Sequence, residues 1–232
     1  MLDGQFLFTS VSVACYARAQ GYEFRIFIST DFASLIHCIY NYLHIIFRRF
    51  EDYIDNGTEI AFFDRFYNWE IAAGSYIVRN SNWSQQFLKG FADYEYRLPT
   101  EYHGTDNGAL HAYIAEMLFS DTRRSELEFC LRIYYNLKSY KDLFTFEACV
   151  RQMIGMHTKI GNIQIYKKGT AWVRDNWMTN SKWSPDKDFM LHNWKIHQLR
   201  RYRQSDLLHG ASKAEWFNPF KGIIQLELCA PG

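Results

Sequence analysis

Seven consecutive residues, Asp64 to Glu70, combine side chains that could bind a sugar. Asp64, Arg65 and Glu70 could form hydrogen bonds with sugar hydroxyls, and the ring of Trp69 could stack on the apolar face of a pyranose. The same residues allow a simpler interpretation, in which Asp64 and Arg65 form a surface ion pair and the aromatic residues belong to the core. The segment is therefore a candidate carbohydrate site, with a structural alternative that stays open.

A second polar segment, His103 to Gly108, contains a candidate catalytic acid. Asp106 could supply a carboxylate near a reacting carbon or a metal ion, with His103 beside it and with Gly104 and Gly108 providing flexibility. A carboxylate in this position could instead be the N-cap of the helix that is predicted to follow, where it would accept backbone N–H groups.

Two histidines could ligate a metal ion, although packing is the commoner role of an isolated histidine. His111 lies one helical turn after Asn107, which favours a packed or surface position. His192 follows the apolar run 189–191, so it could emerge as a ligand from the end of a strand. The acid-x-acid pattern at 186–188 follows Ser-Pro and is typical of a solvated turn, so it is the weaker metal candidate.

The composition is that of a globular protein and disfavours several other classes. The chain has 232 residues, of which 48% are hydrophobic and 22% charged, and this length suits one domain. Its formal charge of +1 lacks the basic excess of a nucleic-acid-binding protein. The longest apolar stretch, 36–47, is too short and too polar to span a membrane. Five cysteines form no C-x-x-C pair, and two sequons, at Asn56 and Asn82, permit N-glycosylation if the chain passes through the secretory pathway.

Strand and helix signals alternate along the chain, which predicts an α/β fold with a largely parallel sheet. Strands are predicted at 22–28, 60–63, 74–79, 163–166 and 189–192. Helices are predicted at 6–20, 33–53, 82–96, 107–119, 126–139 and 141–155. Ligands of such folds bind beyond the carboxyl ends of the strands, and Asp64 and Asp106 fall at edges of this kind.

Five blocks of the sequence together carry a family resemblance. The longest block is Phe63 to Tyr76, and the shorter ones are 103–111, 147–151, 172–175 and 189–192. These blocks resemble a nematode-expanded family of uncharacterised domains that is related to GT-A glycosyltransferases of the α-galactosyl- and α-mannosyltransferase type. The similarity extends from about Cys15 to Phe220.

The resemblance implies a GT-A-like nucleotide-diphospho-sugar transferase fold, with a Rossmann-like, mostly parallel sheet flanked by helices. It implies transfer of a hexose from a nucleotide sugar to a glycan or glycoprotein acceptor in the Golgi lumen, with a divalent cation, Mn²⁺, as cofactor. Asp106 would be the acid near the transferred sugar, and His192 the metal ligand. The substrate-binding residues would be Asp64, Arg65, Trp69, Glu70, Gly74, Ser75, His103, Gly104 and Asn107.

Two departures from the family pattern motivate an alternative function. The family places a strand that ends in an acid-x-acid motif before the helix at 51–54, whereas here Arg49 runs directly into Phe50. There is also little room for the first strand before Phe6. We therefore expect a single glycosyltransferase-like domain, 1–232, that is truncated at the amino terminus and lacks one interior strand and part of the first. The alternative is a non-catalytic remnant or isoform with at most carbohydrate binding. The donor, the acceptor and the pairing of Cys130 with Cys149 stay open.

Overall fold

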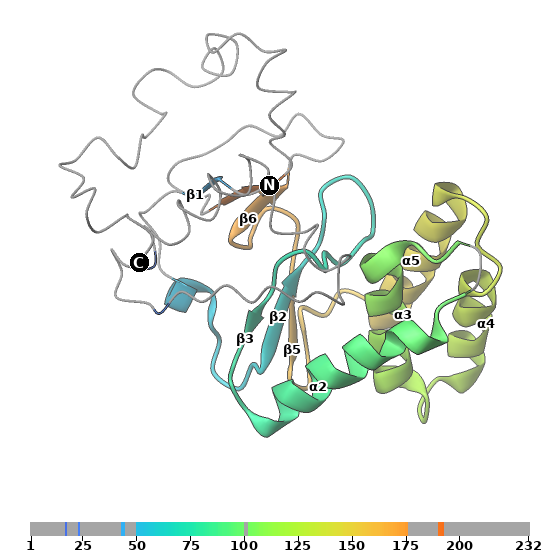
Figure 1. The fold of residues 1–232 in the computed structure, drawn as a ribbon, viewed down its shortest axis with the longest axis horizontal. Helices are drawn as coiled ribbons and strands as arrows, with labels where there is room; N and C mark the ends of the chain where they lie inside the picture. Colours follow the sequence, from blue (N-terminus) through green and yellow to red (C-terminus); the bar gives the residue numbers. More distant parts are fainter. Residues whose placement is uncertain are drawn as a thin grey trace, which may run out of the picture. The chain divides into compact units, whose positions relative to one another are not determined.

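The structure is a computed structural model that describes residues 17, 23, 43–44, 50–99, 102–175 and 190–192. The chain divides into two compact units. One unit is Ile54–Thr170, and the other combines Met1–Tyr53 with Ala171–Gly232. All the candidate residues except His192 belong to the first unit, which contains the green and yellow elements of Figure 1.

A four-stranded mixed sheet, in the order β3-β2-β5-β4, forms the sheet layer of Ile54–Thr170. Its strands are β2 (Ile60–Phe63), β3 (Ile77–Val78), β4 (Lys159–Ile160) and β5 (Ile163–Tyr166). β2 and β5 run parallel, whereas β3 and β4 are antiparallel to their neighbours. The α/β class is confirmed, but the expectation of a largely parallel sheet is wrong for the described strands. No helix separates β2 from β3, and a parallel pair requires a crossover, usually a helix.

Four described α-helices lie beside this sheet (Figure 1). They are α2 (Asn82–Asp93), α3 (Thr105–Phe119), α4 (Arg124–Tyr134) and α5 (Tyr140–Ile154), and the 3-10 helix η3 (Tyr94–Arg97) continues α2. Ser81 caps α2 as predicted, because its hydroxyl accepts the backbone N–H of Ser84. No described helix combines the length and the apolarity that crossing a bilayer requires.

The core of this unit joins the helices to the sheet. Ile60 and Phe62 of β2 pack in one apolar cluster with Leu110 of α3 and Phe146 of α5. A disulfide links Cys130 of α4 to Cys149 of α5, with 5.7 Å between their Cα atoms. The pairing that the sequence left open is thus present, and it ties α4 to α5.

The second unit contains a three-stranded sheet in the order β1-β7-β6. The strands are β1 (Leu43–His44), β6 (Val173–Asp175) and β7 (Met190–His192), and the 3-10 helix η2 (Phe50–Tyr53) belongs to the same unit. The strand predicted at 189–192 is confirmed, whereas β6 was not predicted. The helix predicted at 33–53 is wrong at Leu43–His44, which is a strand, since short apolar runs also suit buried strands. Its last residues, Phe50–Tyr53, are helical as predicted, but as a 3-10 helix. The elements predicted at 6–20 and 22–28 and the acids at 186–188 lie outside the described residues, apart from Ala17 and Glu23.

Candidate functional site

The loop from Asp64 to Ala73, here called the 64–73 loop, turns back along the end of β2. Asp64 and Ile71 form an antiparallel bridge, and the backbone N–H of Arg65 donates to the carbonyl of Glu70 at 2.9 Å. The backbone N–H of Asp64 also donates to the carbonyl of Tyr166, the last residue of β5, at 2.9 Å. The loop therefore lies at the carboxyl ends of the two parallel strands, where ligand sites of α/β folds are found.

Charged side chains in this loop are buried, and aromatic side chains are exposed. Asp64, Arg65 and Glu70 are 8%, 8% and 4% exposed, whereas Tyr67 and Trp69 are 47% and 58% exposed. The interpretation as a surface ion pair with aromatic residues in the core is therefore wrong. The loop presents aromatic surface to solvent and keeps its charges inside, which reverses the usual distribution.

Each buried charge at the ends of this loop has an opposite charge as a partner. Asp64 Oδ2 accepts from Arg151 Nη2 at 2.9 Å, and Arg65 Nη1 donates to Glu70 Oε1 at 2.8 Å. Burial raises the pKa of Asp64, although the nearby Arg151 acts in the opposite direction. Because Arg151 belongs to α5, the first ion pair fixes the start of the loop to that helix.

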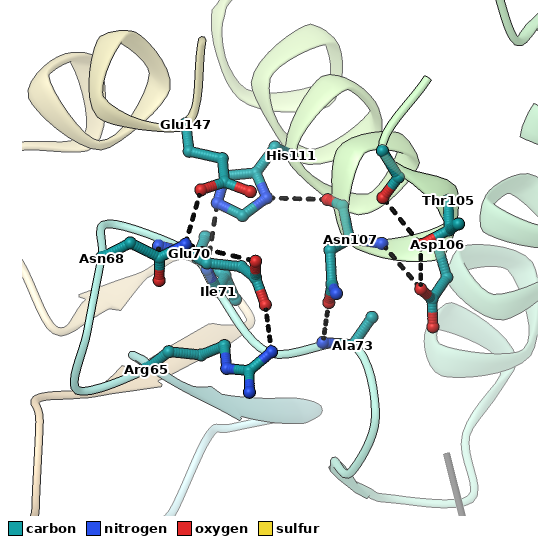
Figure 2. Close-up of polar contacts among 11 residues, drawn as sticks. Arg65, Asn68, Glu70, Ile71, Ala73, Thr105, Asp106, Asn107, His111 and Glu147 are labelled. Carbon is teal, nitrogen blue, oxygen red and sulfur yellow. Dashed lines mark hydrogen bonds and ion pairs between the residues drawn. The ribbon is translucent and has the colours of Figure 1, made fainter. Parts of the chain in front are cut away.

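Asn68 connects the loop to a second acid on α5. Its Nδ2 donates to Glu70 Oε2 at 3.3 Å and to Glu147 Oε2 at 3.0 Å (Figure 2). Glu147 is fully buried, and burial together with the negative charge of Glu70 raises its pKa to about 9. The raised pKa favours the neutral carboxylic acid form of Glu147, which links α5 to the loop through Asn68.

The first turns of α3 hold the other end of the loop (Figure 2). His111 Nε2 accepts the backbone N–H of Ile71 at 3.0 Å, so its Nδ1 carries the proton and donates to the carbonyl of Asn107 at 2.8 Å. The Oδ1 of Asn107 accepts the backbone N–H of Ala73 at 2.9 Å. Burial lowers the pKa of His111. His111 is thus a packed histidine, as predicted, and both of its ring nitrogens are used within the fold.

Asp106 lies at the start of α3, but it is not the N-cap. The N-cap is Gly104, with φ of 68°, and Asp106 is the second residue of the helix. Asp106 Oδ1 accepts from the Thr105 hydroxyl and from the backbone N–H of Asn107, both at 3.0 Å, while His103 Nδ1 accepts the backbone N–H of Thr105 at 3.2 Å. Thr105 has φ of 56°, which is strained for a β-branched residue. The carboxylate is therefore held next to a strained turn, a feature common at functional sites.

Four aromatic residues form a continuous row from the 64–73 loop to the start of α3. Tyr67 contacts Phe144, Phe144 contacts Tyr140, and Tyr140 contacts Tyr102, with ring centroids 6.0, 6.3 and 5.6 Å apart. Tyr102 directly precedes His103 in the sequence. This aromatic row was not predicted from the sequence, although the spacing of Tyr140 and Phe144 places both on one helix face.

The structure brings most of the predicted site residues together in one unit. Gly74 and Ser75 are half-buried between the loop and β3. His192 belongs to the other unit, where the register of β6 and β7 places it opposite Asp175, a buried acid that sequence reasoning missed. Among the described residues, no group of three or more histidines, cysteines and acids could hold a metal ion.

Comparison with known proteins identifies a protein family. No curated protein and no solved structure matches the chain. One protein family, described as "Protein of unknown function, DUF273", matches residues 36–208, a range that includes every candidate residue from Asp64 to His192. Because this match covers well over half of the sequence, the chain belongs to the DUF273 family.

Proposed function

We propose that this protein is a GT-A-like glycosyltransferase that transfers a hexose from a nucleotide-diphosphate sugar to a glycan or glycoprotein acceptor. The proposal combines the resemblance in the sequence to a nematode-expanded, glycosyltransferase-related family with one structural observation. That observation is the pair of exposed rings, Tyr67 and Trp69, on a loop whose charged residues are buried. Aromatic rings of this kind stack on the apolar faces of pyranoses.

The rings lie on a base that is already ordered, which favours binding. The ion pair between Arg65 and Glu70 fixes the loop from inside, and Lys168 Nζ donates to the carbonyl of Asn68 at 2.6 Å. The same ammonium group lies 5.2 Å from the centroid of the Trp69 ring, so a cation stands close to the stacking surface. A rigid loop loses little conformational entropy when a ligand binds.

The aromatic row supports a role for Asp106 near the bound sugar. The row ends at Tyr102, four residues before Asp106, and the hydrogen bonds from Thr105 and Asn107 orient this carboxylate at the start of α3. A saccharide bound at the Tyr102 end of the row would therefore meet a segment that carries a carboxylate four residues further along the chain. This arrangement suits an acid that stabilises charge at a reacting sugar carbon.

A divalent cation, Mn²⁺, belongs to the proposal through the resemblance alone. The described residues do not form a cation site of three or more ligands, so no step is assigned to the metal here. His192 is proposed as one ligand, and the pairing of β6 with β7 places the buried Asp175 opposite it in register. A carboxylate is a ligand type that suits Mn²⁺.

The disulfide supports the secretory pathway, with the Golgi lumen as the compartment that the resemblance implies. Disulfides such as that between Cys130 and Cys149 form and persist in oxidising compartments and are rare in the cytosol.

A second candidate function, carbohydrate binding without catalysis, is favoured by the internal pairing of the loop acids. Asp64 is paired with Arg151 and Glu70 with Arg65, so the loop offers rings to a sugar while its carboxylates face inward. The two functions differ in whether Asp106 takes part in a reaction.

Replacing Trp69 with alanine is expected to weaken saccharide binding about tenfold, because the loss of one stacked ring corresponds to about 1.4 kcal/mol. The melting temperature should change little, since this side chain is 58% exposed. Titration with uridine and guanosine diphosphate hexoses and with neutral oligosaccharides, followed by calorimetry, measures the effect. Tyr96→Ala is the control, because Tyr96 is 86% exposed on η3. Equal affinities of the Trp69 variant and the parent protein would contradict the proposed stacking site.

Replacing Asp106 with asparagine is expected to reduce hexose transfer by about a hundredfold or more, with an unchanged melting temperature. Asparagine keeps the Oδ1 that accepts from Thr105 and Asn107, so only the charge is lost. Transfer is measured with Mn²⁺, a panel of nucleotide sugars and mixed glycan acceptors, and the exposed Asp93→Asn is the control. The same assay with His192→Ala tests the cation ligand. Unchanged transfer would exclude Asp106 from the mechanism, and saccharide binding without any transfer would favour the non-catalytic alternative.

A further inference from the structure

The turn before β2 exposes an asparagine within a sequon, Asn56-Gly57-Thr58. The carbonyl of Asn56 accepts from Lys159 Nζ at 2.8 Å, which fixes the backbone of the turn. The side-chain amide of Asn56 takes part in none of the hydrogen bonds found among the described residues, and the residue is exposed. This side chain is therefore accessible and has no hydrogen-bonding role among the described residues.

The hydroxyl of Thr58 is not explained by the fold. Thr58 is 6% exposed, and its Oγ1 is buried without a hydrogen-bond partner in the described part of the chain. Its backbone is fully used, since its N–H donates to Asp55 and its carbonyl accepts from Arg79. A buried hydroxyl without a partner destabilises a fold, and valine would fill the same space without that cost. The hydroxyl is, however, the feature that the sequon requires at this position.

The second sequon, Asn82-Trp83-Ser84, differs in this respect. Ser84 is 1% exposed, and its Oγ donates to the carbonyl of Glu59 at 3.2 Å and lies 3.0 Å from the hydroxyl of Ser81. These contacts join the Ser84 hydroxyl to the N-cap residue of α2 and to Glu59, the residue before β2. The Ser84 hydroxyl thus has a structural role. Of the two sequon hydroxyls, only that of Thr58 has no such role among the described residues.

The position of Asn56 is compatible with an active site in the 64–73 loop. Asn56 precedes the amino end of β2, whereas the 64–73 loop follows the carboxyl end of the same strand. A glycan on Asn56 would therefore be attached at the opposite end of β2 from the 64–73 loop.

We propose that Asn56 carries an N-linked oligosaccharide. The amide nitrogen forms a bond to C1 of the first sugar of a lipid-diphosphate-linked oligosaccharide, the bond between C1 and the diphosphate oxygen breaks, and the lipid diphosphate leaves while the amide proton passes to a base. The transfer acts on the unfolded chain during translocation, so the later burial of Thr58 does not prevent it. The proposal rests on the secretory compartment of the proposed function and does not depend on glycosyltransferase activity.

The test is translation of the full chain, preceded by a cleavable secretory signal, with microsomes. Protease protection identifies the translocated chains, and their mobility is compared before and after amidase removal of N-glycans. Asn56→Gln and Thr58→Val are each expected to carry one glycan fewer than the parent chain. Asn82→Gln and Ser84→Ala report the occupancy of the second sequon separately, and both should keep the glycan on Asn56. A protease-protected chain without a glycan, or an equal glycan number in Asn56→Gln, would overturn the proposal.

A measurement of thermal stability tests independently whether the hydroxyls of Thr58 and Ser84 have structural roles. In the unglycosylated protein, Thr58→Val should melt no lower than the parent, because it removes a buried hydroxyl without a partner, whereas Ser84→Ala should melt lower. A lower melting temperature of Thr58→Val would show that its hydroxyl is structural after all and would remove the argument for Asn56. Saccharide titration of the same preparations reports on the proposed function separately, so either proposal can fail alone.

Discussion

Raising the pH from 5 to 8.5 is expected to destabilise this protein by several kcal/mol through one buried carboxyl group, that of Glu147. Burial and the negative charge of Glu70 raise the pKa of Glu147 from 4.5 to about 9 in the folded state. Between these two values the unfolded chain releases the proton and the folded chain keeps it. Stability with respect to this group is therefore fully present below pH 4.5 and is lost as the pH rises towards 9, by up to about 1.4 kcal/mol per pH unit.

Two neighbours of Glu147 also titrate differently in the folded and unfolded states. Burial lowers the pKa of His111 in the folded state. As the pH falls below 6.5, the imidazole therefore takes up a proton in the unfolded chain before it does so in the folded chain, and stability is lost. The raised pKa of Asp64 acts in the same direction as that of Glu147. Stability should consequently have its maximum in weakly acidic solution.

The variant Glu147→Gln isolates the effect of the one carboxyl group. Glutamine keeps an oxygen that accepts from Asn68 Nδ2 but cannot ionise, so its stability relative to the parent should increase steadily with pH. Urea unfolding of both proteins at pH 5, 7 and 8.5 measures the difference between their free energies of unfolding. His111 and Asp64 titrate in both proteins, so their contributions cancel in this difference. Glu128→Gln is the control, because Glu128 forms an exposed ion pair with Arg124 on α4. A stability difference that is the same at all three pH values would show that Glu147 is ionised in the fold.

Local patterns in the sequence predicted the elements that carry the site, whereas contacts between distant residues decided its character. The buried run at 60–63, the Ser81 cap and the strand at 163–166 are all confirmed, because alternation and capping are properties of neighbouring residues. The burial of Asp64 could not be predicted in this way. Its partner Arg151 is 87 residues away, and only the packing of α5 against the loop brings the two together.

The start of α3 shows a smaller error with a similar cause. Asp106 was a plausible N-cap by residue type, but the left-handed conformation of Gly104 starts the helix two residues earlier. By residue type alone, the glycines of this segment indicate flexibility. In the structure they are required for close packing, since a Cβ atom on Gly104 would lie 2.5 Å from the Leu143 side chain of α5.

Replacing Gly108 with alanine is expected to lower the stability by about 3 kcal/mol, even though alanine is the better helix former. The intrinsic preference of a helix for alanine over glycine would add about 1 kcal/mol of stability. Against this, the new Cβ would lie 2.2 Å from the backbone carbonyl oxygen of His103 and 3.2 Å from the Tyr134 ring. Because the first obstacle is backbone, the turn that contains Thr105 and Asp106 has to move, and overpacking of this kind costs 1 kcal/mol to several.

The matched control is Gly90→Ala in α2, which makes the same change inside another helix. There the Cβ would lie 2.3 Å from the hydroxyl of Tyr113, the far end of a side chain that can shift. Gly90→Ala should therefore destabilise the protein less than Gly108→Ala does. Thermal and urea unfolding measure both, and for a chain of this length the Gly108 variant should melt about 5 to 10 °C lower. If Gly90→Ala destabilised the protein as much as Gly108→Ala or more, the backbone at the start of α3 would be able to move and accommodate the added Cβ atom. In that case the backbone around Asp106 would not be rigid enough to orient a catalytic carboxylate.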